Sequence, residues 1–475
     1  MRLLALIFIG ASLMGCTVAL GPGFHHADRL VDVSAISIAP AHIHLRVKDS
    51  LANVGNRELR DLDVVLPGGP SFGTRDIVVS VAGKPVETQR VSRESGVSLR
   101  IPFDPAWSQN QEKEIAFDYD LEPASEGRGV VAATADGFYL ADPNIFPAWQ
   151  SPPGPFARSD LRARTEELDV TVPADFRILA VGRERRSDRR GQFVTHRFEM
   201  LRAEFPPYLI AGRYQERRVE AEHGMVIFWT RDTLDEESAR TAARRLIGTH
   251  AAYEQLFGRV TKNSLPLHVV ETSADLAAID ETTADISAAS FPEGVLLDHR
   301  ALAQGLSSDP VLDLADYELA RTWFGWHIRP QPGADLLLGR GMGMFAAVLA
   351  AQGRGGAAVR EQQIARLIAA YDRLGPAADQ KPGFGPALDY TAEQRTAKSY
   401  KAALFLASLE DISGKEGFDR ALRRVLRALS GQEIGSGELR SALEAETGRN
   451  LAEVFHAWLD HAGVPAEFRA RYAGR

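Results

Sequence analysis

Residues 316–325 read DYELARTWFG and are the most informative segment of the chain. Apolar and aromatic residues recur here at helical spacing, which predicts a helix over residues 311–323. Tyr317 and Arg321 are four residues apart, so they lie on one face of this helix with Glu318 beside them. The segment therefore predicts a helix that brings a phenol, a carboxylate and a guanidinium group together inside an apolar and aromatic frame.

The first sixteen residues have the anatomy of a secretory signal peptide. Arg2 supplies a basic start, residues 3–13 form an apolar run, and the small residue Gly15 precedes Cys16. This arrangement resembles the bacterial lipobox, which implies cleavage before Cys16, lipidation of its thiol and attachment to a membrane. Thr17 rather than an aspartate follows, so the resemblance to Gram-negative lipoproteins favours the outer membrane, on the side that faces the periplasm.

The composition is that of a large globular protein without covalent cross-links. The chain has 475 residues, of which 45% are hydrophobic and 25% charged, and this length suggests about three domains. Its net charge of −8 argues against nucleic acid as a partner. Cys16 is the only cysteine, so the folded part has no disulfide bond and no thiolate metal ligand.

Hydrophobic periodicity divides the remainder into four parts. Residues 17–34 contain glycine, proline and a histidine pair and are predicted to be a tether. In residues 35–218, apolar and polar residues alternate within short segments, and turn residues separate these segments. This pattern predicts an antiparallel β-sandwich. Residues 219–355 combine strands with helices, and residues 356–475 show helical spacing to the end. The predicted fold class is therefore α+β and multidomain.

Four segments, in this order along the chain, resemble the membrane alanine aminopeptidase family of zinc peptidases, the gluzincins. Residues 205–212 resemble the end of its sandwich domain, and residues 323–325 follow the helix as the same W-F-G does after the family's metal helix. Residues 400–406 resemble its Y-x-K-G-A-L helix, and residues 439–465 resemble its "G-x-x-L…F-x-x-W-L…G-x-P" ending. The resemblance implies a thermolysin-like domain over residues 219–355, completed by the helical residues 356–475.

The family's zinc ligands are absent from the positions that this resemblance assigns. Its H-E-x-x-H motif holds Zn²⁺ with two histidines and uses the intervening glutamate as general base. The two histidines fall on Tyr317 and Arg321, the third ligand falls on Arg340 when counted without gaps, and only Glu318 is retained. A phenol ionises only near its pKa of about 10, and arginine offers no lone pair.

Other functional positions of the family match less directly. Its oxyanion-stabilising tyrosine falls on Ser399 if Lys401 matches the lysine of the motif. Tyr400 lies one residue away and is the remaining candidate for a catalytic tyrosine. The exopeptidase loop G-A-M-E-N-P-G resembles residues 289–294 only distantly, and Glu293 reaches the amine-binding glutamate position only with a gap.

Two arrangements around the retained glutamate follow from these substitutions. In the first, the guanidinium groups of Arg321 and Arg340 take the place of the metal and pair with Glu318, which keeps the charge roughly balanced. In the second, a metal is held elsewhere, by His299 and His327 together with Glu318.

The sequence therefore predicts an exported lipoprotein with an aminopeptidase-like fold and without zinc catalysis, which binds peptides or envelope proteins. We expect no bound cofactor, although the family resemblance implies zinc. One alternative is an active zinc aminopeptidase with non-standard metal ligands. Another is a different hydrolase built on Glu318, Tyr400 and an added nucleophile.

Overall fold

The computed structural model describes the larger part of the chain. The described residues are 24–38, 41–67, 72–93, 96–123, 131–134, 137–140, 146–150, 165–200, 208–232, 234–259, 266–272, 288–298, 302, 313–331, 333–380, 383–384, 390–428 and 433–472. The predicted signal peptide with Cys16 lies outside them, as does His299. The predictions for these residues are therefore not tested by the structure.

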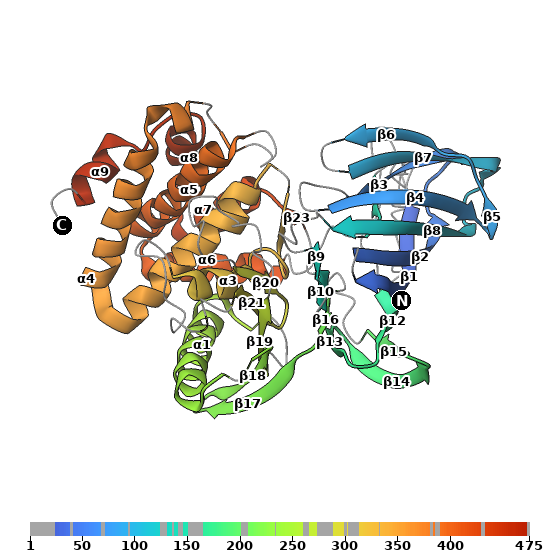
Figure 1. Cartoon of the computed structure of the whole chain (residues 1–475). Coiled ribbons are helices and arrows are strands. Elements are labelled where there is room, and N and C mark those ends of the chain that lie inside the picture. Colours follow the sequence, from blue (N-terminus) through green and yellow to red (C-terminus); the bar gives the residue numbers. More distant parts are fainter. Residues whose placement is uncertain are drawn as a thin grey trace, which may run out of the picture.

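An eight-stranded sheet dominates the N-terminal part (Figure 1). Its strands are β1 (Phe24–Ile38), β2 (Ala41–Asn53), β4 (Phe72–Val81), β5 (Lys84–Pro85), β8 (Glu112–Pro123), β12 (Thr165–Pro173), β14 (Arg183–Arg190) and β15 (Phe193–Glu199). Their spatial order is β14-β15-β12-β1-β2-β8-β4-β5. All pairs are antiparallel except β1 with β12, which run parallel, so the predicted antiparallel sandwich has one exception.

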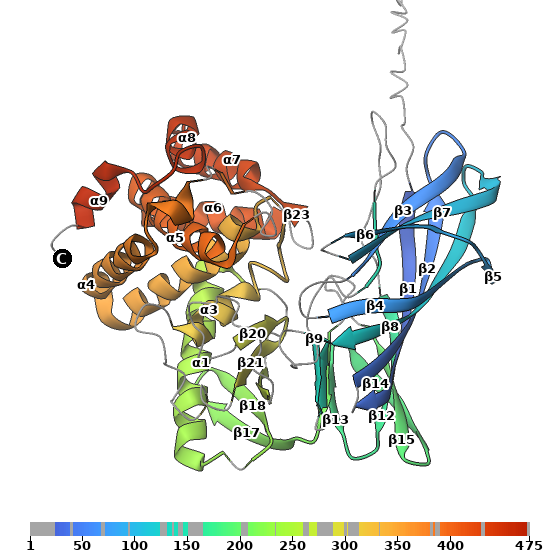
Figure 2. The ribbon, with the colours of Figure 1, turned by 45° about the horizontal axis from the view of Figure 1, so that its top comes forward.

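Two four-stranded sheets accompany the large one. The first has the order β11-β3-β7-β6 and contains β3 (Leu59–Pro67), β6 (Gln89–Arg93), β7 (Gly96–Trp107) and β11 (Ala148–Trp149). The second has the order β13-β16-β10-β9 and contains β9 (Val131–Thr134), β10 (Gly137–Leu140), β13 (Arg177–Ala180) and β16 (Leu209–Gly212). Figure 2 shows the second sheet between the large sheet and the C-terminal part.

Side-chain alternation creates the core of the sandwich. Along β2, Leu45 and Val47 are buried while Arg46 between them is exposed, as expected for a strand with one face against a core. Trp149 of β11 packs edge-on against Phe24 of the large sheet, with ring centroids 6.0 Å apart, and against Phe117, at 5.6 Å. These contacts join two sheets across a shared core, the arrangement of a β-sandwich.

Residues 24–34 belong to this sandwich and not to the predicted tether, because they form most of β1. Arg29 is buried, and its guanidinium donates to both oxygens of the Asp49 carboxylate, at 2.7 and 2.8 Å. It also donates to the backbone oxygen of Pro147 at 2.7 Å, and the Trp149 indole donates to Asp49 at 2.8 Å. The tether was predicted from the glycines, the proline and the histidine pair of residues 17–34, and this composition does not reveal that Arg29 has its partner inside the fold.

A mixed five-stranded sheet begins the second part. It consists of β17 (Gln215–Ala221), β18 (Gly224–Thr230), β19 (Leu267–Thr272), β20 (Ala288–Phe291) and β21 (Gly294–Asp298). Their order is β17-β18-β19-β21-β20, with parallel inner pairs and antiparallel pairs at both edges. The predicted boundary at residue 218 falls inside β17, so this part starts a few residues earlier than predicted.

Helices cover the rest of the second part, away from the sandwich (Figure 1). The main ones are α1 (Glu236–Phe257), α3 (Leu314–Arg321), α4 (Met342–Leu374), α5 (Ala392–Ser413), α6 (Lys415–Ala428), α7 (Ser436–Thr447), α8 (Ala452–Leu459) and α9 (Ala466–Tyr472). A π-helical segment, η2 (Asp335–Gly341), leads into α4, a short 3₁₀ turn, η3 (Pro376–Asp379), follows it, and β22 (Arg329–Pro330) pairs in parallel with β23 (Glu433–Ile434). The mixture of sheets and helices confirms the predicted α+β class.

Helix α4 crosses the boundary predicted at residue 355. It is interrupted only at Gly356, whose φ of 79° lies in the left-handed region that glycine adopts without strain. The stretch Asp335–Leu374 is long and apolar enough to cross a membrane by length and composition, but 78% of its most apolar window is buried inside the fold. We interpret it as a core helix.

The buried Arg29–Asp49 pair provides a test of the sandwich core. Asp49→Asn leaves the buried guanidinium without its counter-charge, so we expect the free energy of unfolding to fall by about 3–5 kcal/mol. Asp175→Asn is the matched control, because it removes the exposed partner of Arg213 and is expected to cost less than about 1 kcal/mol. Urea denaturation of both variants measures the difference, and equal losses would contradict the assignment.

Candidate functional site

Buried polar contacts hold helix α3 in place. The Asp313 side chain caps its first turn by accepting from the Asp316 backbone N–H at 3.2 Å. The Asp316 carboxylate is 1% exposed and accepts from Thr249 Oγ1 of α1 at 2.8 Å and from Arg354 Nη2 of α4 at 2.5 Å. The Tyr253 hydroxyl donates to the backbone oxygen of Asp316 at 3.0 Å. Helix α3 is therefore fastened to α1 on one side and to α4 on the other.

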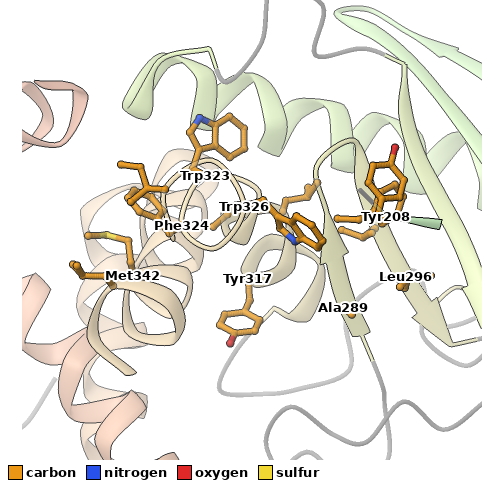
Figure 3. Packing of buried hydrophobic residues seen from close by; sticks show 14 of the residues in the cluster. Tyr208, Ala289, Leu296, Tyr317, Trp323, Phe324, Trp326 and Met342 are labelled. Carbon is orange, nitrogen blue, oxygen red and sulfur yellow. The ribbon is translucent and has the colours of Figure 1, made fainter. Parts of the chain in front are cut away.

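Two tryptophans fix the segment that follows α3 (Figure 3). The Trp323 indole donates to the Gly258 backbone oxygen at the end of α1, at 2.8 Å, and its ring packs edge-on against Tyr253 at 5.8 Å. The Trp326 indole donates to the backbone oxygen of Ser290, on edge strand β20, at 3.0 Å. The aromatic residues recognised in the sequence are thus structural contacts that position α3 against β20.

Glu318 lies at the centre of this arrangement with its carboxylate buried. The residue is 1% exposed, and no hydrogen bond of regular geometry reaches either oxygen from the described residues. The nearest opposite charge is Arg321, whose Nη1 is 3.7 Å from Glu318 Oε2. Burial raises the pKa of the Glu318 carboxyl from 4.5 to about 7, and the charges of Arg321 and Arg340 and the nearby Ser290 only partly offset this effect.

Residues at the positions that the family resemblance assigns to zinc ligands lie near this carboxylate. The Tyr317 ring is buried, and the Arg321 guanidinium lies 5.9 Å from its centroid. Arg340, on η2, is close enough to lower the pKa of Glu318. A Cβ atom at Gly343 would lie 2.8 Å from the Tyr317 ring and 3.3 Å from Arg321 Cγ, so glycine is needed where α4 approaches α3.

These side chains do not fit a zinc ion. Zinc requires lone pairs from nitrogen, sulfur or oxygen, and the Arg321 guanidinium offers none and adds a positive charge. Within the part of the chain that the structure describes, no three His, Cys, Asp or Glu side chains converge as a metal site would require. His327 is buried, but the His299 that was predicted to join it lies outside the described residues. A metal site that includes His299 therefore stays untested.

The candidate tyrosine region belongs to helix α5. Ser399, which matches the family's tyrosine, donates its hydroxyl proton to the Arg395 backbone oxygen of the same helix at 2.8 Å. The neighbouring Tyr400 is 7% exposed. The geometry thus gives Ser399 a local role in α5, and a catalytic role for Tyr400 remains a prediction.

A buried charge network on α5 was missed in the sequence. Lys401 Nζ donates to Asp379 Oδ2 at 3.0 Å and to the His461 backbone oxygen at 2.5 Å, and Lys398 pairs with the other Asp379 oxygen. All three charged residues are at most 2% exposed, and the Tyr371 hydroxyl also donates to Asp379, at 2.6 Å. The only sequence signal was two lysines in an apolar helix, which alone does not reveal a partner 22 residues away.

Glu293, which the family resemblance brings to the amine-binding position only with a gap, has a structural partner. The Tyr208 hydroxyl donates to Glu293 Oε2 at 2.7 Å, and the Tyr208 ring packs against Phe291 with centroids 5.0 Å apart. Tyr208 directly precedes β16 of the sandwich part, whereas Glu293 lies in the β20–β21 turn. This hydrogen bond therefore connects the two parts of the molecule.

The pKa of Glu318 predicts a pH-dependent stability. Folding raises the pKa of the Glu318 carboxyl. The contribution of this group to the free energy of unfolding is therefore fully present below about pH 4.5 and is lost as the pH rises through about 7. Glu318→Gln is neutral at every pH, so we expect its stability relative to wild type to rise by about 2–3 kcal/mol between pH 5 and pH 8.5. Urea denaturation at both pH values checks this. Glu416→Gln, at an exposed position, serves as the control. If the stability difference between Glu318→Gln and the wild type were the same at both pH values, the raised pKa of Glu318 would be contradicted.

Comparisons with known proteins identify the fold. The sequence matches no family model and no curated protein. The structure is similar to the crystal structure of an M1 zinc metallopeptidase from Deinococcus radiodurans, with a TM-score of 0.63 and 16% identity over 93% of this chain and 95% of that one. A mutant of that enzyme gives a TM-score of 0.64 at 15% identity, over 93% and 96% of the two chains. The same mutant bound to a Tyr-Ser-Ala substrate gives a TM-score of 0.63 at 16% identity, over 93% of this chain and 95% of that one. The protein thus has the two-domain fold of the M1 metallopeptidases, an aminopeptidase-like architecture.

Proposed function

We propose that this protein is a membrane-anchored, aminopeptidase-like lipoprotein that does not catalyse hydrolysis and instead binds peptides or envelope proteins. The observation that carries the proposal is the Arg321 guanidinium, 3.7 Å from the buried Glu318 carboxylate. The resemblance assigns a histidine ligand of zinc to this position. A permanent positive charge there pairs with the glutamate and gives no lone pair to a metal.

Glu318 alone is a poor catalyst of peptide hydrolysis. Water that is not bound to a metal has a pKa of about 15.7. A carboxylate whose pKa is about 7 removes a proton from such water only at a cost of about 12 kcal/mol. Arginines stand at two of the three positions that the resemblance assigns to zinc ligands, and no metal-ligand cluster among the described residues supplies the missing activation. Both observations support the proposed loss of the general-base role.

Peptide binding is supported by the retained architecture. The similar Deinococcus radiodurans structure was solved with a tripeptide substrate, and the fold match extends over 93% of this chain. The contacts that position α3 against β20 are made by aromatic and backbone groups and do not depend on a metal. An architecture that is similar to that of a peptide-binding enzyme and is held together without a metal supports our proposal that this protein binds peptides without cleaving them.

Metal analysis of the full-length protein purified in detergent tests the loss of catalysis. We expect substoichiometric zinc and no aminopeptidase activity above that of Glu318→Ala. The triple variant Tyr317→His, Arg321→His, Arg340→Glu recreates the ligand set and is expected to gain about one zinc per chain. Stoichiometric zinc in the wild type, together with chelator-sensitive activity, would overturn the proposal in favour of an active aminopeptidase with non-standard ligands.

The lipid anchor is tested at Cys16, the only cysteine. Each buried methylene of an acyl chain contributes about 0.8 kcal/mol to membrane binding. We therefore expect wild-type protein to fractionate with the outer membrane and to incorporate a clickable palmitate analogue. Cys16→Ser should lose the label and the membrane fractionation. Persistent membrane fractionation of an unlabelled Cys16→Ser protein, after a high-salt wash, would contradict lipidation as the anchor.

A further inference from the structure

Two histidines lie side by side on the surface of the helical part. His456 is in the last turn of α8 and His461 is in the turn that follows, and both residues are exposed. Their ring centroids are 4.9 Å apart. A spacing of five residues on a continuous helix would point the two side chains in different directions, so the pair forms because α8 ends at Leu459. Figure 2 shows α8 at the outer edge of the helical part.

The separation of the two rings suits a shared metal ion. Zinc binds histidine nitrogens at about 2.0–2.1 Å in tetrahedral geometry, which places the centroids of two bound imidazoles about 5 Å apart. The 4.9 Å between His456 and His461 agrees with this value. Because both side chains are exposed, an ion reaches them from solution without any opening in the fold.

Asp460 orients the ring of His456. Its carboxylate lies 2.7 Å from His456 Nδ1 and can only accept, so Nδ1 carries the proton and Nε2 keeps its lone pair. Histidines that bind metals donate their second nitrogen to a carboxylate in the same way. The C-terminal end of α8 also favours a cation, because its last carbonyl groups carry partial negative charge.

The backbone on both sides of the pair is fixed by buried groups. Trp458 of α8 packs against Phe405 of α5, with ring centroids 5.6 Å apart. The backbone oxygen of His461 accepts from the buried Lys401 Nζ at 2.5 Å. The turn that carries His461 is therefore held against α5, and the two rings approach each other from backbone that is already in place.

We propose that His456 and His461 bind one divalent transition-metal ion of the zinc class, with water in its remaining coordination positions. Imidazole nitrogen suits such ions, whereas Mg²⁺ prefers oxygen ligands. Among the described residues no group of three His, Cys, Asp or Glu side chains forms a metal site, so the two rings leave an open site. Such a site exchanges its ion more readily than a structural zinc site with four protein ligands.

Isothermal titration calorimetry with Zn²⁺ alone tests the site. The protein is the full-length chain in detergent, without an affinity tag, treated with chelator and dialysed at about pH 7.5, where ligand histidines are neutral. We expect one ion per chain and no binding of Mg²⁺. His456→Ala and His461→Ala should each weaken Zn²⁺ binding at least tenfold. Asp460→Asn, which removes the orienting carboxylate, should weaken it by about tenfold.

His223→Ala is the matched control, because it removes an exposed histidine in the turn between β17 and β18. It should leave Zn²⁺ binding unchanged. Thermal denaturation of the metal-free variants checks that each is folded, and the exposed positions of both histidines predict unchanged melting temperatures. The site would be overturned if the wild type bound no Zn²⁺, if binding persisted in either histidine variant, or if His223→Ala weakened it equally.

These outcomes are independent of the proposed loss of catalysis. Chelator and dialysis empty a site with two protein ligands, so the purified protein still contains substoichiometric zinc. The double variant His456→Ala, His461→Ala removes this site from the metal analysis altogether. Zinc retained by the double variant, together with chelator-sensitive peptidase activity, would refute the proposed function and would leave the His456–His461 site to be decided by the titration.

Discussion

The contact between the Glu318 carboxylate and the Arg321 guanidinium governs the chemistry of the second part of the molecule. An isolated carboxylate cannot be buried at 1% exposure without a large desolvation cost, which either a neighbouring cation or protonation must reduce. Here both operate, because arginine charge lies 3.7 Å away and the pKa still rises to about 7. The same guanidinium offers no lone pair to a metal ion, which is the basis of our proposal that the glutamate has lost its catalytic partner.

The scaffold around this contact does not need a metal. Asp316 joins α3 to α1 and α4 through Thr249 and Arg354, and the indoles of Trp323 and Trp326 join the following segment to α1 and β20. Breaking one of these buried hydrogen bonds would leave a donor or acceptor unsatisfied inside the fold and would lower the free energy of unfolding. They hold α3 in place in a chain that shares only 15–16% identity with M1 metallopeptidases of the same fold.

Buried charged residues are the features that sequence interpretation judged least well. Arg29 was predicted to lie in a solvated tether but pairs with Asp49 in the sandwich core, and the network of Asp379, Lys398 and Lys401 was not anticipated. In each case the partner is 19 or more residues away, so no local pattern reveals it. Helices were predicted more accurately, as with residues 311–323, which contain α3 and its cap Asp313, because spacing and caps are local signals.

The sequence by itself determined the class of fold and the identity of the residues at the former ligand positions. The alternation of apolar and polar residues and the helical spacing of apolar residues are local patterns of the sequence. The inability of arginine to bind zinc is a property of the side chain alone. Only the tertiary structure decided that Arg321 and Arg340 reach the same carboxylate, that Glu293 is engaged by Tyr208, and that residues 24–34 form a strand. The physical reason is that burial and charge pairing depend on the distance between side chains that are far apart in the sequence. Burial in particular set the pKa of Glu318 and left Arg321 as its exposed neighbour.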